Sequence, residues 1–169
     1  MLELTVYDED REVLLKFEHS LLSLSKWEAR TKKAFLTNVA KSNEELIQYY
    51  QDMLVSPEGR RDLVYLLDPE QLVELQDYMN GSQTASSVPQ ETSSKFNPEV
   101  TTSELIYYWL VGLQIPFHPV ETWHITRLMM LVQITSYKNQ PPKKKKSADV
   151  MAEWAAINEA RKKEFGTSG

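Results

Sequence analysis

The sequence contains no cysteine among its 169 residues. Disulfide bonds, cysteine nucleophiles and thiolate metal ligands are therefore excluded, and the composition fits a reducing compartment. Only five glycines are present, at positions 59, 81, 112, 166 and 169. No GxGxxG, P-loop or GxSxG motif can be written with this spacing. Nucleotide hydrolysis and α/β-hydrolase chemistry consequently have very little support.

Long hydrophobic runs are also missing. The sequence has no run of about 18 apolar residues, so no membrane-spanning helix and no membrane partner are predicted. The opening residues, MLELTVYDEDREV, are acidic and alternating. They lack the basic, then apolar, then small-residue pattern of a signal peptide. We therefore expect a protein of the cytoplasm.

Charge is divided unevenly along the chain. Residues 1–137 hold 11 Lys+Arg and 20 Asp+Glu, a balance of -9, and residues 138–169 hold 8 and 4, a balance of +4, which together give the net -5. An acidic body with a basic tail indicates an interaction tail rather than a nucleic-acid-binding domain. We predict two parts, 1–137 and 138–169. Within the first, the Ser-, Thr-, Gln- and Pro-rich residues 82–99 predict a flexible loop.

Two short segments near the N-terminus have the alternation of strands. In residues 2–7 (LELTVY) and 13–19 (VLLKFEH), apolar and polar side chains alternate, and a polar DEDRE turn separates the two segments. A β-hairpin is predicted. Because a lone hairpin is marginal in water, it must pack against other elements.

Helix-start signals follow in series. Residues 25–28 (SKWE) and 42–45 (SNEE) match the capping box, in which a serine and a glutamate three residues later cap each other's backbone amides. Asp68-Pro69 provides an N-cap and a proline at the first helical position. Residues 101–104 (TTSE) open a further helix. The sequence thus predicts a mainly helical protein.

The most hydrophobic stretch lies between residues 101 and 137. Two helices are predicted there, with Pro116 ending the first and Pro119 starting the second, which runs to about Tyr137. The short IPFHP link favours a central αα-hairpin in a compact helical domain. Trp109 and Trp123, like Trp27, are assigned to the core. The predicted fold class is therefore mainly α with a small N-terminal β-hairpin (α+β) and a C-terminal helical arm.

The C-terminal part is predicted to be an interaction arm. Pro141 and Pro142 break the preceding helix, and a final helix starts at Ser147 and is ended by Gly166. Its apolar stripe is thin for a core helix and fits an arm that folds against a partner. The candidate partner-binding residues are Lys143, Lys144, Lys145, Lys146, Val150, Met151, Trp154 and Ile157.

Three potential metal ligands are spaced three residues apart between residues 118 and 124. His118, Glu121 and His124 could share a helical face, and a carboxylate with two imidazoles can bind zinc. The HExxH arrangement is absent, and His118 precedes a proline at a helix start, where its direction differs. We interpret His124 as a partly buried polar group. No metal, no other cofactor and no catalytic residue are predicted.

The lysine run at 143–146 is compatible with binding to an acidic surface. Four lysines without interleaved aromatic residues are usually a solvated linker, so no nucleic-acid partner is expected. If the run did contact DNA, affinity would fall steeply as salt concentration rises.

Four segments, taken together, resemble the tail assembly chaperones encoded before the tape measure gene of long-tailed siphophages. They are residues 20–36 (SLLSLSKWEARTKKAFL), 102–117 (TSELIYYWLVGLQIPF), 121–134 (ETWHITRLMMLVQI) and 158–169 (NEARKKEFGTSG). The segments occur in order from near the start of the chain to its end. The DEDRE turn, residues 36–43 (LTNVAKSN) and the 82–99 loop match no pattern of the family.

The resemblance implies an assembly factor without catalytic activity. Such chaperones coat the tape measure protein, recruit tail tube protein and self-associate, in the host cell cytoplasm and absent from the mature virion. The short reading frame is often extended by a ribosomal frameshift. Two alternatives stay open: a structural tail protein of the virion, such as a completion or terminator subunit, and a small nucleic-acid-binding regulator.

Overall fold

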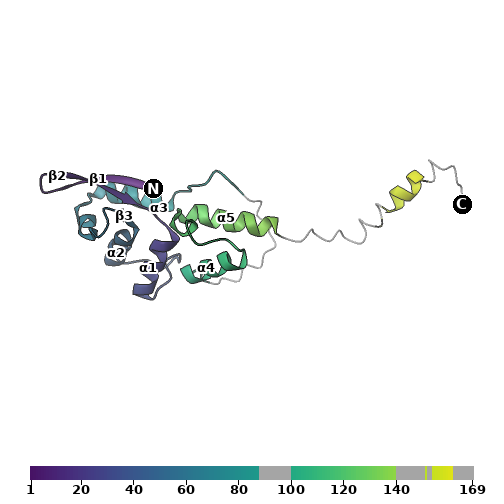
Figure 1. The fold of residues 1–169 in the computed structure, drawn as a ribbon, viewed down its shortest axis with the longest axis horizontal. Coiled ribbons are helices and arrows are strands. Elements are labelled where there is room, and N and C mark those ends of the chain that lie inside the picture. The colour runs from purple at the N-terminus through teal and green to yellow at the C-terminus, as the bar shows by residue number, and fades with distance from the viewer. Residues whose placement is uncertain (88–99, 140–150, 152–153, 162–169) are drawn as a thin grey trace. The chain divides into compact units, whose positions relative to one another are not determined.

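The computed structural model describes residues 1–87, 100–139, 151 and 154–161. The chain divides into two units, Met1–Lys138, which we call the body, and Asn139–Gly169, which we call the arm. The body combines a small antiparallel sheet with helices (Figure 1). The predicted fold class, mainly α with a small N-terminal β-hairpin, is confirmed.

The sheet is built around the predicted hairpin. β1 (Leu2–Asp8) pairs antiparallel with β2 (Arg11–Phe17), so the turn between them is only two residues long. The buried side chains alternate along both strands, as the sequence predicts. β3 (Leu54–Ser56) adds a third strand on the other side of β2. A three-residue strand carries no readable periodicity, and the sequence did not reveal it.

The first helix begins earlier than predicted. α1 (Leu21–Thr31) has Ser20 as its N-cap, and the Ser20 side chain accepts from the Ser23 amide while the Ser23 side chain accepts from the Ser20 amide. The predicted capping box at residues 25–28 is therefore wrong. At the third helical position, Ser23 stands where the usual capping box has glutamate or glutamine, so the sequence pattern did not reveal the start at Ser20.

The next two helix starts agree with prediction. α2 (Asn43–Met53) is capped by Ser42 and Glu45, and α3 (Pro69–Asn80) is capped by Asp68 with proline at its first position. A 3-10 helix, η1 (Arg61–Leu66), lies between them. It packs against α2 and β1.

The hydrophobic stretch forms two helices, as predicted: α4 (Ser103–Gly112) and α5 (Ile125–Lys138). Residues 120–122 form the single 3-10 turn η2 (Val120–Thr122), so α5 starts six residues after Pro119. α4 packs against α1. The buried residues that the two helices contribute to the core are Ile106, Leu110, Ile125, Leu128 and Val132.

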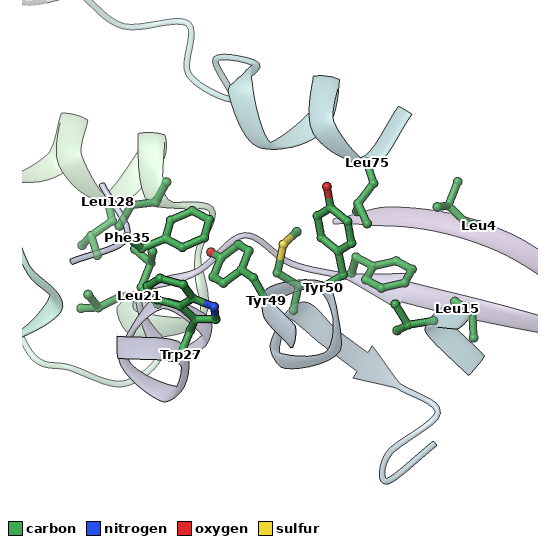
Figure 2. Close-up of a cluster of buried hydrophobic side chains, with 14 of the residues drawn as sticks. Leu4, Leu15, Leu21, Trp27, Phe35, Tyr49, Tyr50, Leu75 and Leu128 are labelled. Carbon is green, nitrogen blue, oxygen red and sulfur yellow. The ribbon is translucent and has the colours of Figure 1, made fainter. Parts of the chain in front are cut away.

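An aromatic group occupies one end of the core (Figure 2). Phe35 stacks on Tyr49 with ring centroids 3.8 Å apart, and Trp27 meets Phe35 edge-on at 5.1 Å. Toward the other end, Leu75 from α3 lies near Tyr50, and Leu4 and Leu15 come from the sheet. α1 and α2 are therefore joined through the loop that carries Phe35.

Candidate functional site

The described part of the arm presents exposed apolar side chains. Met151 and residues 154–161 are helical. Met151, Trp154 and Ile157 are 74%, 60% and 47% exposed. Residues spaced by three follow one another along one side of a helix. The helix therefore carries a short apolar stripe, which we call the arm stripe: Met151, Trp154 and Ile157.

The other predicted partner-binding residues cannot be placed. Lys143, Lys144, Lys145, Lys146 and Val150 lie outside the described residues. The described arm helix ends with two charged groups, Glu159 and Arg161, and both are exposed. Of the eight candidates, the structure thus brings together the three that form the arm stripe, and these three stay candidates.

The four tryptophans fall into three environments. Trp27 is 1% exposed, and its indole Nε1 donates a 2.9 Å hydrogen bond to the Glu45 carbonyl oxygen. Trp109 and Trp123 are only partly buried, and the Arg127 guanidinium lies 5.1 Å from the centroid of the Trp123 ring. Trp154 is exposed. Trp109 and Trp123 pack against the core, as expected, but each is only partly buried, unlike Trp27.

The three residues considered for a metal site have separate surroundings. His118 is exposed, and Glu121 accepts a 3.0 Å hydrogen bond from the Tyr107 hydroxyl. His124 is buried at the start of α5. Within the ranges that the structure describes, no three His, Asp or Glu residues are arranged to hold a metal ion.

Glu28 is a buried carboxylate that sequence reasoning missed. It is 6% exposed, and its Oε1 accepts from the Phe35 amide at 2.9 Å. Its Oε2 accepts from the Ser103 amide at 2.7 Å and from the Ser103 hydroxyl at 2.6 Å. Three donors match what a buried carboxylate requires. Glu28 therefore ties α1 to the following loop and to the first turn of α4.

Two buried histidines form a second polar group. His19 Nδ1 shares a hydrogen bond with the Tyr49 hydroxyl, and the His19 and His124 ring centroids are 5.2 Å apart. His124 Nε2 donates to the Tyr78 carbonyl at 3.2 Å, so this nitrogen carries the proton of a neutral ring. Burial, with a smaller contribution from His124, lowers the pKa of His19 to about 3. Burial also lowers the pKa of His124.

Asp52 belongs to the third buried polar group. It forms ion pairs with Arg30 and, at 3.4 Å from its Oδ1, with Arg61. Oδ1 has no partner of hydrogen-bond geometry among the described residues. Burial raises the pKa of this carboxyl, and the two arginines oppose that shift.

None of these four buried residues lines the pocket that the structure describes between α1 and α2. Glu28, His19, His124 and Asp52 are each at most 6% exposed, and each is bonded to neighbouring elements. We interpret them as structural. The structural role of these residues can be seen only from their hydrogen-bond and ion-pair partners in the fold. In the sequence, no motif or spacing distinguishes them from other polar residues.

The chain was compared with protein-family models, with characterised proteins and with solved structures, and none of the three comparisons found a match. Among the helices that the structure describes, none has the length and apolar character needed to cross a membrane.

Proposed function

We propose that this chain is a phage tail assembly chaperone that acts without catalysis. It would bind the tape measure protein, keep it soluble and promote polymerisation of the tail tube protein around it. The four segments that resemble siphophage tail assembly chaperones support this function. Self-association and a location in the host cytoplasm, with absence from the mature virion, belong to the same proposal.

The observation that carries the proposal is the exposure of the arm stripe. A tryptophan that is 60% exposed leaves a large apolar surface in contact with water. Tryptophan is enriched among the residues that dominate binding energy at interfaces. Met151 beside it is a flexible side chain that can repack against different surfaces. An arm with such a stripe fits transient contact with a long apolar helix.

Co-expression tests this function. The tape measure protein, which is long and apolar in places, is expected to be recovered in the soluble fraction when this chain is co-expressed and to precipitate without it. Equal recovery with and without the chain, together with no complex in a pull-down, would exclude the chaperone function.

Mass spectrometry of purified virions separates the chaperone from a structural tail protein. A chaperone leaves after assembly, so the chain is expected to be absent or far below the abundance of tail tube protein. Recovery at a fixed stoichiometry with known tail proteins would favour a structural role.

A further inference from the structure

A pocket of about 280 Å³ opens in the body between α1, α2 and the loop that joins them. Its apolar wall is formed by Trp27, Ala34, Val39, Ala40 and Val100. Lys33, Lys41, Glu45 and Thr37 complete the lining. Pockets for drug-sized ligands run from about 300 to 1,000 Å³. This pocket lies at the lower end of that range and has room for one large apolar side chain.

We call this pocket the Trp27 pocket. Its Trp27 wall is fixed by contacts with the core. The Trp27 indole donates a hydrogen bond to the Glu45 carbonyl. Phe35, which meets Trp27 edge-on behind the lining, is fixed by its stack on Tyr49 and by the hydrogen bond that its amide donates to Glu28. A site whose walls are already bonded to the core loses little conformational entropy when it is filled. Val39 and Val100 meanwhile stay more than half exposed at its mouth.

The mouth of the Trp27 pocket is cationic, although residues 1–137 carry a balance of -9. Lys33 is paired with Glu45 at 2.6 Å. The ammonium group of Lys41 lies 4.6 Å from the centroid of the Phe35 ring and makes no ion pair with any described residue. The pocket thus offers an apolar wall beside two lysines and one glutamate, Glu45, which acts electrostatically on Lys41, so the lining keeps a net charge of +1.

We propose that the Trp27 pocket binds a large apolar side chain from an acidic segment of a partner polypeptide, with a neighbouring carboxylate of that segment pairing with Lys41. The inference rests on the proposed chaperone function. It gives the client a second contact besides the arm stripe, and it states the chemistry of the client segment that would bind there. Charge complementarity selects this occupant. The arm of this chain, residues 139–169, holds 7 Lys+Arg and 4 Asp+Glu, a balance of +3, and is therefore a less complementary occupant than an acidic segment.

Three synthetic helical peptides test the pocket on the full-length protein. One carries a phenylalanine flanked by two glutamates, one has lysines in place of the glutamates, and one has alanine in place of the phenylalanine. The readout is the NMR shift of the Trp27 indole N–H and of the Val39 and Ala40 amides. We expect the acidic phenylalanine peptide to shift these signals and the other two to leave them in place.

Two pairs of variants locate the binding. Ala40→Phe fills the pocket and is expected to abolish the shifts, whereas Ala29→Phe, on an exposed position of α1 outside the pocket, keeps them. Lys41→Gln is expected to weaken binding of the acidic peptide about fivefold, as for one exposed ion pair. Lys26→Gln, an exposed lysine outside the lining, is the matched control.

The inference is overturned if the lysine peptide binds as tightly as the acidic one, or if Ala40→Phe leaves the shifts unchanged. The chaperone function is tested apart from it by co-expression. If wild-type chain and Ala40→Phe both raise the solubility of the tape measure protein equally, the function stands and the pocket is not the client site. If wild-type chain raises no solubility, the function itself fails.

Discussion

At the scale of single residues, Glu28 is the carboxylate on which three segments of the body converge. We expect Glu28→Ala to lower the free energy of unfolding by about 2–4 kcal/mol, because two backbone amides and a hydroxyl lose their acceptor in a buried site. Urea denaturation measures this loss. Ser103→Ala removes only the hydroxyl donor and should cost about 1 kcal/mol. A loss below 0.5 kcal/mol for Glu28→Ala would contradict a supporting role.

The tryptophans differ in what their removal should cost. Trp27→Ala is expected to destabilise the body by about 3–5 kcal/mol, since a fully buried ring and its hydrogen bond are lost. Trp154→Ala should change stability by less than about 0.5 kcal/mol, because the ring is exposed. Thermal or urea unfolding of the two variants makes the comparison. Equal destabilisation by both would show that Trp154 is part of a folded core.

The buried histidines give a pH dependence with a definite sign. Unfolded His19 gains a proton below about pH 6.5, whereas the folded ring, whose pKa is about 3, stays neutral. The unfolded state therefore binds more protons, and stability falls as pH drops from 6.5 toward 3. His19 alone should remove about 2 kcal/mol between pH 7 and pH 5. The lowered pKa of His124 acts in the same direction.

His19→Asn isolates this effect. The amide can still bond to the Tyr49 hydroxyl but does not titrate. Denaturation at pH 7 and pH 5 is expected to show a smaller loss for the variant than for wild type, by about 2 kcal/mol. Parallel losses in the two proteins would contradict the assignment of a buried neutral His19.

At the scale of secondary structure, the start of α1 can be tested directly. Ser20 caps the helix in the structure, whereas Ser25, the N-cap expected from the sequence, lies inside it. We expect Ser20→Ala to cost about 1–2 kcal/mol and Ser25→Ala to cost less than about 0.5 kcal/mol, since alanine is the better helix former at an interior position. Urea denaturation of both variants measures the two losses of stability. The reverse order would place the helix start at Ser25.

Local signals predicted those elements whose own residues determine them. The β1–β2 alternation, the Ser42–Glu45 cap and the Asp68-Pro69 start depend on neighbours within four residues, and each was confirmed. The start of α1 is also local, but it was missed because Ser23 stands where the usual capping box has glutamate. Strand β3 and the roles of Glu28 and His19 depend on partners that are distant in sequence. Glu28 and Ser103, for example, are 75 positions apart. No local pattern could have revealed that contact.

At the scale of the whole molecule, the body and the arm use apolar residues differently. In the body, most of the large aromatic and aliphatic side chains form one core, joined by the buried polar contacts of Glu28, His19 and Asp52, although several others, such as Tyr65 and Tyr108, are exposed. In the described part of the arm, the apolar side chains are exposed. Under the proposed chaperone function, the core of the body supplies folding stability, and the arm stripe, with the Trp27 pocket as a second contact, would bind the client.

The affinity of the full-length chain for the tape measure protein, compared between wild type and Trp154→Ala, tests this division most directly. Removing a central aromatic anchor from an interface costs about 2 kcal/mol or more, so we predict at least a tenfold rise in the dissociation constant with an unchanged melting temperature. An unchanged dissociation constant, or a loss of binding that only follows a loss of folding, would contradict the account.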